Sequence, residues 1–206
     1  MALSYKYNSW YPKQTGQQYL FLGLQLGYCS GSFSQTVRKA CNALINTAGG
    51  IIVFGVEKET GIIKGVSEEL NREQQDLYRL AVDRELRNFT PSVQPDSYRI
   101  NIVGIDELGE KTSRARHVLE IKVSVGRDMF EDSRQEVYVV KHNKVHGPLF
   151  PQELKDLVLI KYKEEIILRA TALNKDETLN SSISVLDDKN SRQMTKLNFY
   201  KSLTVP

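Results

Sequence analysis

Continuous apolar runs and amphipathic stretches alternate along most of the chain. Residues 19–26 (YLFLGLQL) and 51–56 (IIVFGV) are apolar runs of strand length, and such runs predict buried strands. Four apolar residues between these runs recur at helical spacing: Val37, Ala40, Cys41 and Leu44. This spacing predicts a helix that begins after an N-cap at Ser34 and ends near Ile45.

A glycine pair, Gly49-Gly50, stands between that helix and the strand at 51–56. Glycine has no Cβ, so the backbone can reverse sharply there, and the pair predicts a tight helix-to-strand turn. Residues 61–66 (GIIKGV) predict a short partner strand that follows a turn at 58–61.

A second helix is expected over about 68–89, and Pro91 ends it. Its apolar residues form a broad face: Leu77, Tyr78, Leu80, Ala81, Val82, Leu86 and Phe89. Charged residues at i, i+4 spacing mark the side that faces water: Arg79, Asp83 and Arg87.

Three strands are expected next: 97–105, 116–125 and 136–141. In the second of them, apolar residues alternate with Glu120, Lys122 and Ser124. Because successive side chains of a strand point to opposite faces, this alternation predicts that these three side chains face water.

Pro151 begins a third helix that extends to about Leu168. Four consecutive apolar residues cover every side of one turn of this helix: Leu157, Val158, Leu159 and Ile160. Two interpretations stay open. Either the helix inserts deeply into its own domain, or these four residues form an interface with another subunit.

The order of these elements predicts an α+β fold, a mixed β-sheet with packed helices. One domain is expected over residues 1–170. Residues 171–206 are rich in Ser, Asn, Lys and Asp, which predicts a polar tail or linker with one short helix near 190–203.

The distribution of charge is more informative than the net charge. The chain has 28 Lys and Arg against 25 Asp and Glu, yet no acid precedes Glu57, so residues 1–56 are locally basic. Two cysteines, Cys29 and Cys41, cannot form a disulfide framework, and with three scattered histidines they match no zinc spacing. The sequence opens with no signal peptide and contains no apolar run of 18 residues. We therefore expect an intracellular protein, with the cytoplasm as its first expected location and no membrane contact within these residues.

Several motifs occur in an order that resembles the Schlafen core, a divergent Alba-like domain, over about residues 15–165. The first is the segment VRKACNALINTAGGIIVFGVEKETGIIKGV at 37–66. Its matching residues are Ala43, Asn46, Thr47, Gly49, Gly50, Gly55, Val56, Glu57 and Gly65. The segments HVLEIKVSVG and EVYVVKHNKVHGPLFPQEL resemble the penultimate strand and the closing strand, loop and helix start. The resemblance implies a single Schlafen- or Alba-like lobe.

Active Schlafen nucleases carry three carboxylates, which hold a divalent metal against the scissile phosphate. The resemblance places Glu57 at the third position. A preferred alignment places Gln25 and Leu20 at the first two positions, and a shifted alignment places Leu20 and Thr15 there. We therefore assign no catalytic residue and no metal to this chain alone, and Mg²⁺ or Mn²⁺ to a catalytic partner. Glu57 is either a surface acid in a turn or a leftover ligand.

Phosphate binding needs Lys and Arg side chains gathered on one side of a fold. The candidate RNA contacts are Arg38, Lys39, Arg114, Arg116, Lys122, Lys141, His142 and Lys144. The last three stand on the loop VKHNKVHG, which is either a phosphate-binding loop or a plain hairpin-like connection. Tyr138 is expected in the core, with a base-stacking platform as the alternative.

The resemblance extends to short nematode Schlafen-like subunits of an RNA endonuclease that processes small-RNA (piRNA-type) precursors. It implies a non-catalytic subunit that binds RNA and assembles with a catalytic Schlafen-like partner into a hetero-oligomer. One alternative is a stand-alone Alba-like nucleic-acid-binding module. Another is an active metal-dependent endoribonuclease that uses acids from later loops, such as Glu107, Glu110 or Asp128.

Overall fold

The computed structural model describes residues 4–26, 31–67, 70–106, 116–168 and 171. The strands are β1 (Tyr5–Lys6), β2 (Tyr19–Gly23), β3 (Gly50–Phe54), β4 (Tyr98–Asp106), β5 (His117–Val123), β6 (Val139–Lys141) and β7 (Lys144–His146). The helices are α1 (Ser32–Ile45), α2 (Arg72–Arg87) and the short 3-10 helix η1 (Pro95–Ser97). A further helix covers residues 151–168, as its sequence predicted. The predicted α+β class is confirmed.

The chain divides into two compact units, residues 1–158 and 159–206, and the helix at 151–168 contains this boundary. A boundary at residue 170 and a polar tail beyond it stay predictions, because residues 172–206 lie outside the described part of the chain. No helix in the described ranges has the length and apolar character needed to cross a membrane.

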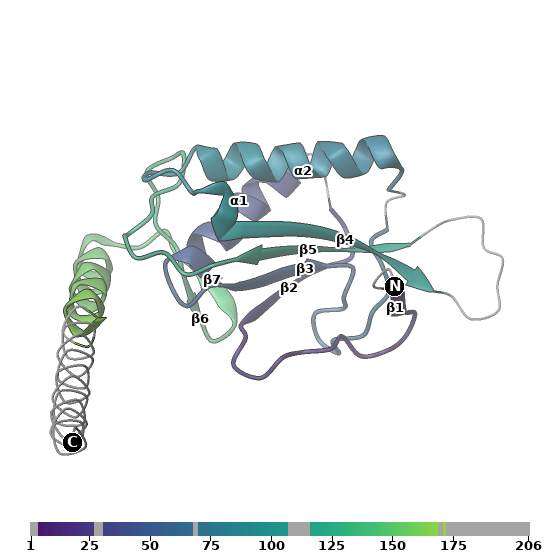
Figure 1. Cartoon of the computed structure of the whole chain (residues 1–206), viewed down its shortest axis with the longest axis horizontal. Coiled ribbons are helices and arrows are strands. Elements are labelled where there is room, and N and C mark those ends of the chain that lie inside the picture. Colours follow the sequence, from purple (N-terminus) through teal and green to yellow (C-terminus); the bar gives the residue numbers. More distant parts are fainter. Residues whose placement is uncertain (1–3, 27–30, 68–69, 107–115, 169–170, 172–206) are drawn as a thin grey trace, which may run out of the picture. The chain divides into compact units, whose positions relative to one another are not determined.

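Five strands form a mixed sheet in the order β1-β4-β5-β3-β2 (Figure 1). Strand β5 pairs antiparallel with β3 and β4, whereas β2 runs parallel to β3 and β1 runs parallel to β4. A hairpin cannot join parallel neighbours, and α1 provides the crossover from β2 to β3. The carboxyl ends of β2 and β3 therefore lie at the same edge of the sheet.

Helices α1 and α2 pack together over one face of the sheet (Figure 1). All four residues that the helical spacing singled out in α1 are buried: Val37, Ala40, Cys41 and Leu44. They pack with Leu20, Ile52 and Ile121 of the sheet in the main hydrophobic core. Burial raises the pKa of the Cys41 thiol above its ordinary value, so this cysteine is an inert core residue. Cys29 lies outside the described residues.

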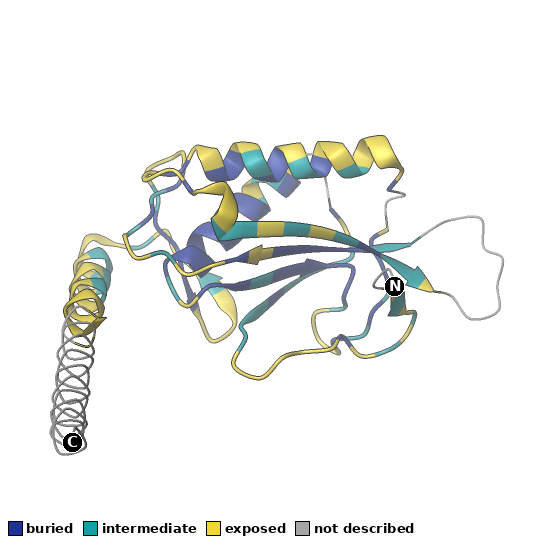
Figure 2. Ribbon diagram, viewed as in Figure 1, coloured by how far each residue is buried: buried dark blue, intermediate teal, exposed yellow. Residues whose placement is uncertain are grey.

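Helix α2 begins later than predicted and buries a narrower face. Asn71 caps it, because the Asn71 side chain accepts from the Gln74 N–H and the Gln74 side chain accepts from the Asn71 N–H. Figure 2 shows one buried stripe along this helix. Leu77 and Leu80, predicted on the apolar face, are 39% and 64% exposed, because a helix that contacts its neighbours on one side buries only one stripe.

The other face of the sheet carries a second, smaller core. Tyr11 packs there with Val53, Val56, Ile63 and Val118. The prediction that Glu120 faces water is wrong: it is buried, 6% exposed. The N-terminal segment covers it, and the Tyr5 and Tyr11 hydroxyls donate to its carboxylate. Alternation along β5 assigned Glu120 to the correct face but could not show that this segment, more than a hundred residues earlier, covers it.

The glycine pair forms the predicted turn between α1 and β3. Gly49 and Gly50 have φ of 68° and 154°. A Cβ on Gly49 would lie 2.8 Å from the Val123 carbonyl oxygen, and a Cβ on Gly50 would lie 2.8 Å from the Gln18 carbonyl oxygen. Both backbone conformation and close approach therefore require glycine here.

Two short segments differ from the sequence prediction. Residues 61–66 form isolated bridges and no strand: Val56 opposes Ile63, and Trp10 opposes Ile62. The segment at 136–141 is a strand only from Val139, and it continues into an unpredicted partner, β7. The connection between β6 and β7 is therefore a β-hairpin, and phosphate binding by this hairpin stays a prediction.

Candidate nucleic-acid interface

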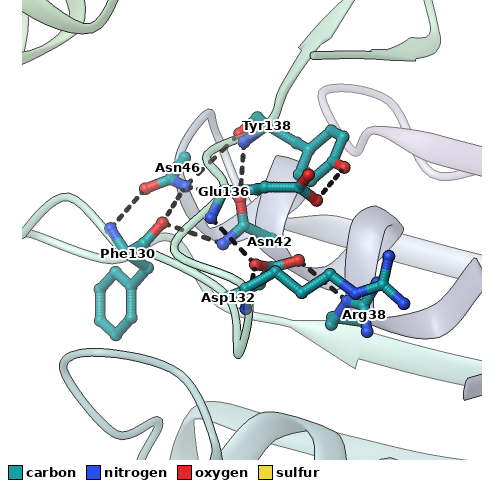
Figure 3. A network of polar contacts seen from close by, with 8 residues as sticks. Arg38, Asn42, Asn46, Phe130, Asp132, Glu136 and Tyr138 are labelled. Atoms are coloured by element: carbon teal, nitrogen blue, oxygen red, sulfur yellow. Dashed lines mark hydrogen bonds and ion pairs between the residues drawn. The ribbon is translucent and has the colours of Figure 1, made fainter. Parts of the chain in front are cut away.

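Asn42 of α1 and Asn46, the residue that caps the end of α1, anchor the loop that joins β5 to β6 (Figure 3). Asn46 accepts from the Phe130 N–H and donates to the Phe130 carbonyl oxygen, each across 2.8 Å. Asn42 accepts from the Tyr138 N–H at 2.7 Å and donates to the same Phe130 oxygen at 2.9 Å. Both asparagines are buried, so these bonds replace water for the loop backbone. The sequence pointed to Asn46 only as one of the residues that carry the resemblance to the Schlafen core.

Arg38 belongs to this loop anchor and not to a solvent-facing surface. Its Nε lies 2.9 Å from an Asp132 carboxylate oxygen, and both side chains are buried (Figure 3). Asp132 also accepts from the Arg134 and Glu136 N–H groups. Arg38 therefore stabilises the loop, because a buried charge must keep its partner, and its contact with RNA stays a prediction.

The adjacent surface holds four of the other predicted cations. Lys39 lies over the ring of Tyr138, with its Nζ 5.6 Å from the ring centroid. The remaining three stand on the β6–β7 hairpin: Lys141, His142 and Lys144. The Thr47 hydroxyl accepts from the Val140 N–H, which fixes the hairpin to the end of α1. Tyr138 is buried, as expected, and its phenol pKa is raised by burial and by its hydrogen bond to Glu136.

The hairpin has the geometry of a two-residue turn, with His142 and Asn143 at φ of 52° and 59°. Lys141 is not simply solvated, because its Nζ lies 2.9 Å from Glu153, as does the His146 Nε2. Hydrogen bonds from Lys141, His146 and the Phe150 N–H lower the pKa of Glu153 to about 2, so this carboxylate is charged at neutral pH. Lys144 and His142 are exposed.

Lys122 lies apart from this group, at an exposed position of the sheet face opposite the helices, which we call the open sheet face. It is directly opposite Arg99 of β4 and Ile51 of β3. Both cations are exposed, and neither makes an ion pair with a described residue. Like charges at directly opposed positions repel each other, so this pair favours an anion between them.

The three family acid positions do not assemble a metal site. Glu57 and Gln25 follow the carboxyl ends of β3 and β2, which share one edge of the sheet. Leu20 is buried in the main core on the helix side, and Thr15 is exposed. Among the residues that the structure describes, no three His, Cys, Asp or Glu side chains are placed to hold a metal ion. At these three positions the described residues offer one carboxylate, whereas Mg²⁺ or Mn²⁺ is held by several oxygen ligands.

Glu57 lies in a small backbone ladder at that edge. The Glu57 N–H donates to the Ile62 carbonyl oxygen at 3.0 Å, and Ile62 opposes Trp10 in an antiparallel bridge. Opposed residues share a face, and Val56, Ile63 and Tyr11 are buried on the inner one. Glu57, Ile62 and Trp10 therefore project outward together. The Thr60 hydroxyl donates to the Glu57 carboxylate.

Aromatic and cationic side chains adjoin this outward face. The Arg116 guanidinium carbon lies 4.8 Å from the Tyr7 ring centroid, and the Lys64 Nζ lies 5.6 Å from it. Lys64 also donates to the Asn8 side chain at 2.6 Å, and Arg116 donates to the Lys64 carbonyl oxygen. Trp10 is 73% exposed. Sequence reasoning missed this tryptophan, because nothing in NSWYPK marks it as exposed.

The predicted contacts thus divide among three places. The hairpin and α1 hold Lys39, Lys141, His142 and Lys144, the open sheet face holds Lys122, and the edge near Glu57 holds Arg116. Arg114, Glu107 and Glu110 lie outside the described residues, and Asp128 is exposed in the loop after β5.

The sequence model of a protein family described as "Schlafen, AlbA_2" matches residues 11–147, well over half of the chain. Among solved structures, the chain is similar to the crystal structure of the DIP2311 protein from Corynebacterium diphtheriae, with 17% sequence identity and a TM-score of 0.44. This similarity covers 66% of the present chain and 26% of that chain, so the present chain spans about a quarter of that protein's length.

Proposed function

Because the chain belongs to the Schlafen AlbA_2 family, we propose that it is a non-catalytic, RNA-binding subunit of an endoribonuclease complex. Membership of this family indicates a nucleic-acid-related function. In the complex, a Schlafen-type partner with its three carboxylates would supply the divalent metal and the cleavage chemistry. This chain would supply contacts to RNA and to the partner.

The observation that carries the proposal is which residues occupy the three positions where active Schlafen nucleases have carboxylates. Glu57 is the first acid of the chain, and Leu20 is buried in the main hydrophobic core on the helix side of the sheet. One carboxylate cannot neutralise and orient a catalytic Mg²⁺, which is held by several oxygen ligands. The lobe therefore retains the family fold without the means to cleave.

Cations at three places of the first unit support RNA binding. Lys39 of α1 lies over Tyr138, next to the hairpin that carries three cations. The Arg99–Lys122 pair lies on the sheet face opposite the helices, and Arg116 lies over Tyr7. Phosphate contacts of this kind act largely without regard to sequence and weaken with salt. The RNA class, a small-RNA precursor, follows from the resemblance to nematode subunits and belongs to the same proposal.

The helix at 151–168 supports a protein partner. Val158, Leu159 and Ile160 are exposed, and Leu157 is half-buried. Exposed apolar residues that adjoin one another are typical of protein–protein contacts. The interface assigned to these four residues remains our proposal.

The stand-alone nucleic-acid-binding module is the second candidate. The observation that favours it is the edge near Glu57. Trp10 is exposed there opposite Ile62, and two cations, Lys64 and Arg116, lie over the Tyr7 ring. A lobe of this kind would bind nucleic acid without a second lobe.

The purified chain should bind labelled RNA and leave it intact in the presence of Mg²⁺ or Mn²⁺. The complex recovered from its native cells should cleave precursor RNA, and Glu57→Gln in this chain should not abolish that cleavage. Metal-dependent cleavage by the lone chain that Glu57→Gln abolishes would overturn the non-catalytic assignment.

The partner is tested with Leu159→Lys, and Leu80→Lys serves as the matched control. Both positions are exposed apolar positions on helices, at 46% and 64%. Leu159→Lys should reduce recovery of a carboxylate-bearing Schlafen-type partner, whereas Leu80→Lys should not. Equal recovery with both variants, from a chain that still binds RNA, would favour the stand-alone module.

A further inference from the structure

Trp10 is the one tryptophan of this chain, and it is held in an unusual position for a large apolar side chain. Its backbone is fixed by the ladder, because the Tyr11 N–H donates to the Gly61 carbonyl oxygen and the Ile63 N–H donates to the Ser9 carbonyl oxygen. Its ring lies beside Gly61, yet 73% of the residue is exposed. A rigid backbone therefore presents an aromatic surface to solvent.

The surroundings of Trp10 are cationic on one side. Lys64 lies two residues from Ile62, which opposes Trp10, and its Nζ is held by Asn8. Arg116 and Lys64 both lie over the Tyr7 ring, and the Arg116 guanidinium donates to the Lys64 carbonyl oxygen. We define these residues as the Trp10 patch: Tyr7, Trp10, Lys64 and Arg116. Ile62 lies between Trp10 and Glu57, because the Glu57 N–H donates to the Ile62 carbonyl oxygen. A negative charge therefore adjoins the cationic patch.

We propose that the Trp10 patch is a nucleotide-binding site for single-stranded RNA, in which an unpaired base stacks on Trp10 and a phosphate contacts Lys64 and Arg116. An exposed indole offers a π-face to any base, and stacking of this kind tolerates different sequences. The cations offer the charge that a phosphate needs. The Glu57 carboxylate repels phosphate, so it directs the backbone toward Lys64 and Arg116. This site deepens the proposed function and depends on it.

Single-stranded RNA is favoured over a duplex by the same geometry. In an A-form duplex the bases are stacked on each other and their faces are closed to a side chain. An unpaired nucleotide exposes its base, so Trp10 can stack on it without the cost of opening a pair. A protein partner would equally cover an exposed tryptophan, and the experiment below distinguishes that occupant.

Intrinsic fluorescence tests the site directly, because the emission of the lone tryptophan reports on Trp10 alone. The probe is a short, fluorescein-labelled single-stranded RNA, with the same sequence in a duplex as its comparison, and binding is measured in parallel by anisotropy on the full chain. Single-stranded RNA should quench Trp10 over the concentration range in which anisotropy rises. Trp10→Ala should weaken binding by at least about fivefold, and Trp10→Phe should restore most of the affinity.

Phe150→Ala is the matched control, since Phe150 is an aromatic residue of the same unit with 75% exposure. It should leave the affinity unchanged. Lys64→Gln should weaken binding and lower its dependence on salt, whereas Lys155→Gln, on an exposed helix position, should do neither.

Failure of the site and failure of the proposed function give different results. If RNA raises the anisotropy but does not quench Trp10, and Trp10→Ala binds as wild type does, the patch is not the site and RNA binding stands. If the emission of Trp10 changes only when the protein partner binds, and not when RNA binds, the occupant of the patch is that partner. The proposed nucleotide site is then overturned. If no RNA binds at all, the proposed function fails and this inference fails with it.

Discussion

The Tyr11 hydroxyl donates a hydrogen bond to the Glu120 carboxylate across 2.8 Å, although 109 positions separate the two residues. Tyr5 donates to the same carboxylate oxygen, and Asn101 lies 3.4 Å from the other one. The N-terminal segment is thereby fixed to the middle of the sheet. This segment continues into the ladder that positions Trp10, so the contact also supports the proposed nucleotide site.

Replacing Glu120 with Gln should lower the free energy of unfolding by about 1–3 kcal/mol. Two hydroxyls converge on one charged acceptor, and an amide oxygen accepts them less strongly. Urea denaturation of the variant measures the change. Glu59→Gln, at an exposed turn position, serves as the control and should remain within about 0.5 kcal/mol of wild type. Equal stability of the two variants would mean that the tyrosine contacts are not stabilising.

Stability should fall at alkaline pH. Burial, and then the hydrogen bond to Glu120, raise the phenol pKa of Tyr5 and Tyr11 above the ordinary value of 10.0, and burial raises the pKa of Tyr98 to about 12. A raised pKa in the folded state means that the unfolded chain loses its protons first. The contribution to stability is therefore complete below about pH 10 and declines as the pH rises above it. Urea midpoints across this range measure the decline, which should be shallower in Tyr11→Phe.

Gly49→Ala should destabilise the fold more than Gly16→Ala. Both glycines have positive φ, 68° and 79°, so both substitutions carry the backbone strain of about 1 kcal/mol. A Cβ on Gly49 would also meet the Val123 carbonyl oxygen at 2.8 Å, whereas nothing lies within 4 Å of a Cβ on Gly16. The difference between the melting temperatures of the two variants therefore measures the effect of the contact between the new Cβ and the Val123 carbonyl oxygen. A melting temperature no lower for Gly49→Ala than for Gly16→Ala would contradict the packing described at this turn.

Asn46→Ala should release the loop between β5 and β6. The Phe130 N–H would be buried without its acceptor, which costs about 1–3 kcal/mol. Limited proteolysis should show faster cleavage within 126–136, together with a lower urea midpoint. Asn88→Ala, at the exposed end of α2, is the control and should leave cleavage in this loop as it is in wild type. Unchanged proteolysis of Asn46→Ala would show that Asn42 alone holds the loop.

Lys144→Gln should weaken RNA binding more than Lys141→Gln. Lys141 is paired with Glu153, whereas Lys144 is exposed and makes no ion pair with a described residue. Each lost phosphate contact lowers the slope of log affinity against log salt by about 0.7 for a single strand. Glu153→Gln should strengthen binding, because it frees Lys141 and removes a carboxylate that stays charged down to a pH of about 2. If neither lysine variant changes the affinity or the slope, the hairpin is not part of the RNA site.

The sequence alone determined the elements whose residues recur with a clear period. The helical spacing of α1, the alternation of β5, the run at β3 and the proline at residue 151 each predicted an element that the structure contains. The glycine pair predicted its turn for the same reason: local backbone sterics decide where a chain can reverse. The lack of any acid before Glu57 is likewise a property of the sequence, and it needs no structure to be seen.

Only the tertiary structure decided which side of a periodic element meets water and which charged groups meet each other. Glu120 is buried because the Tyr5–Tyr11 segment covers it, and Arg38 is buried because Asp132 reaches it from a loop far along the chain. Trp10 is exposed because its neighbours in the ladder point inward. In each case the partner lies more than forty residues away, and local periodicity carries no information about contacts at that separation.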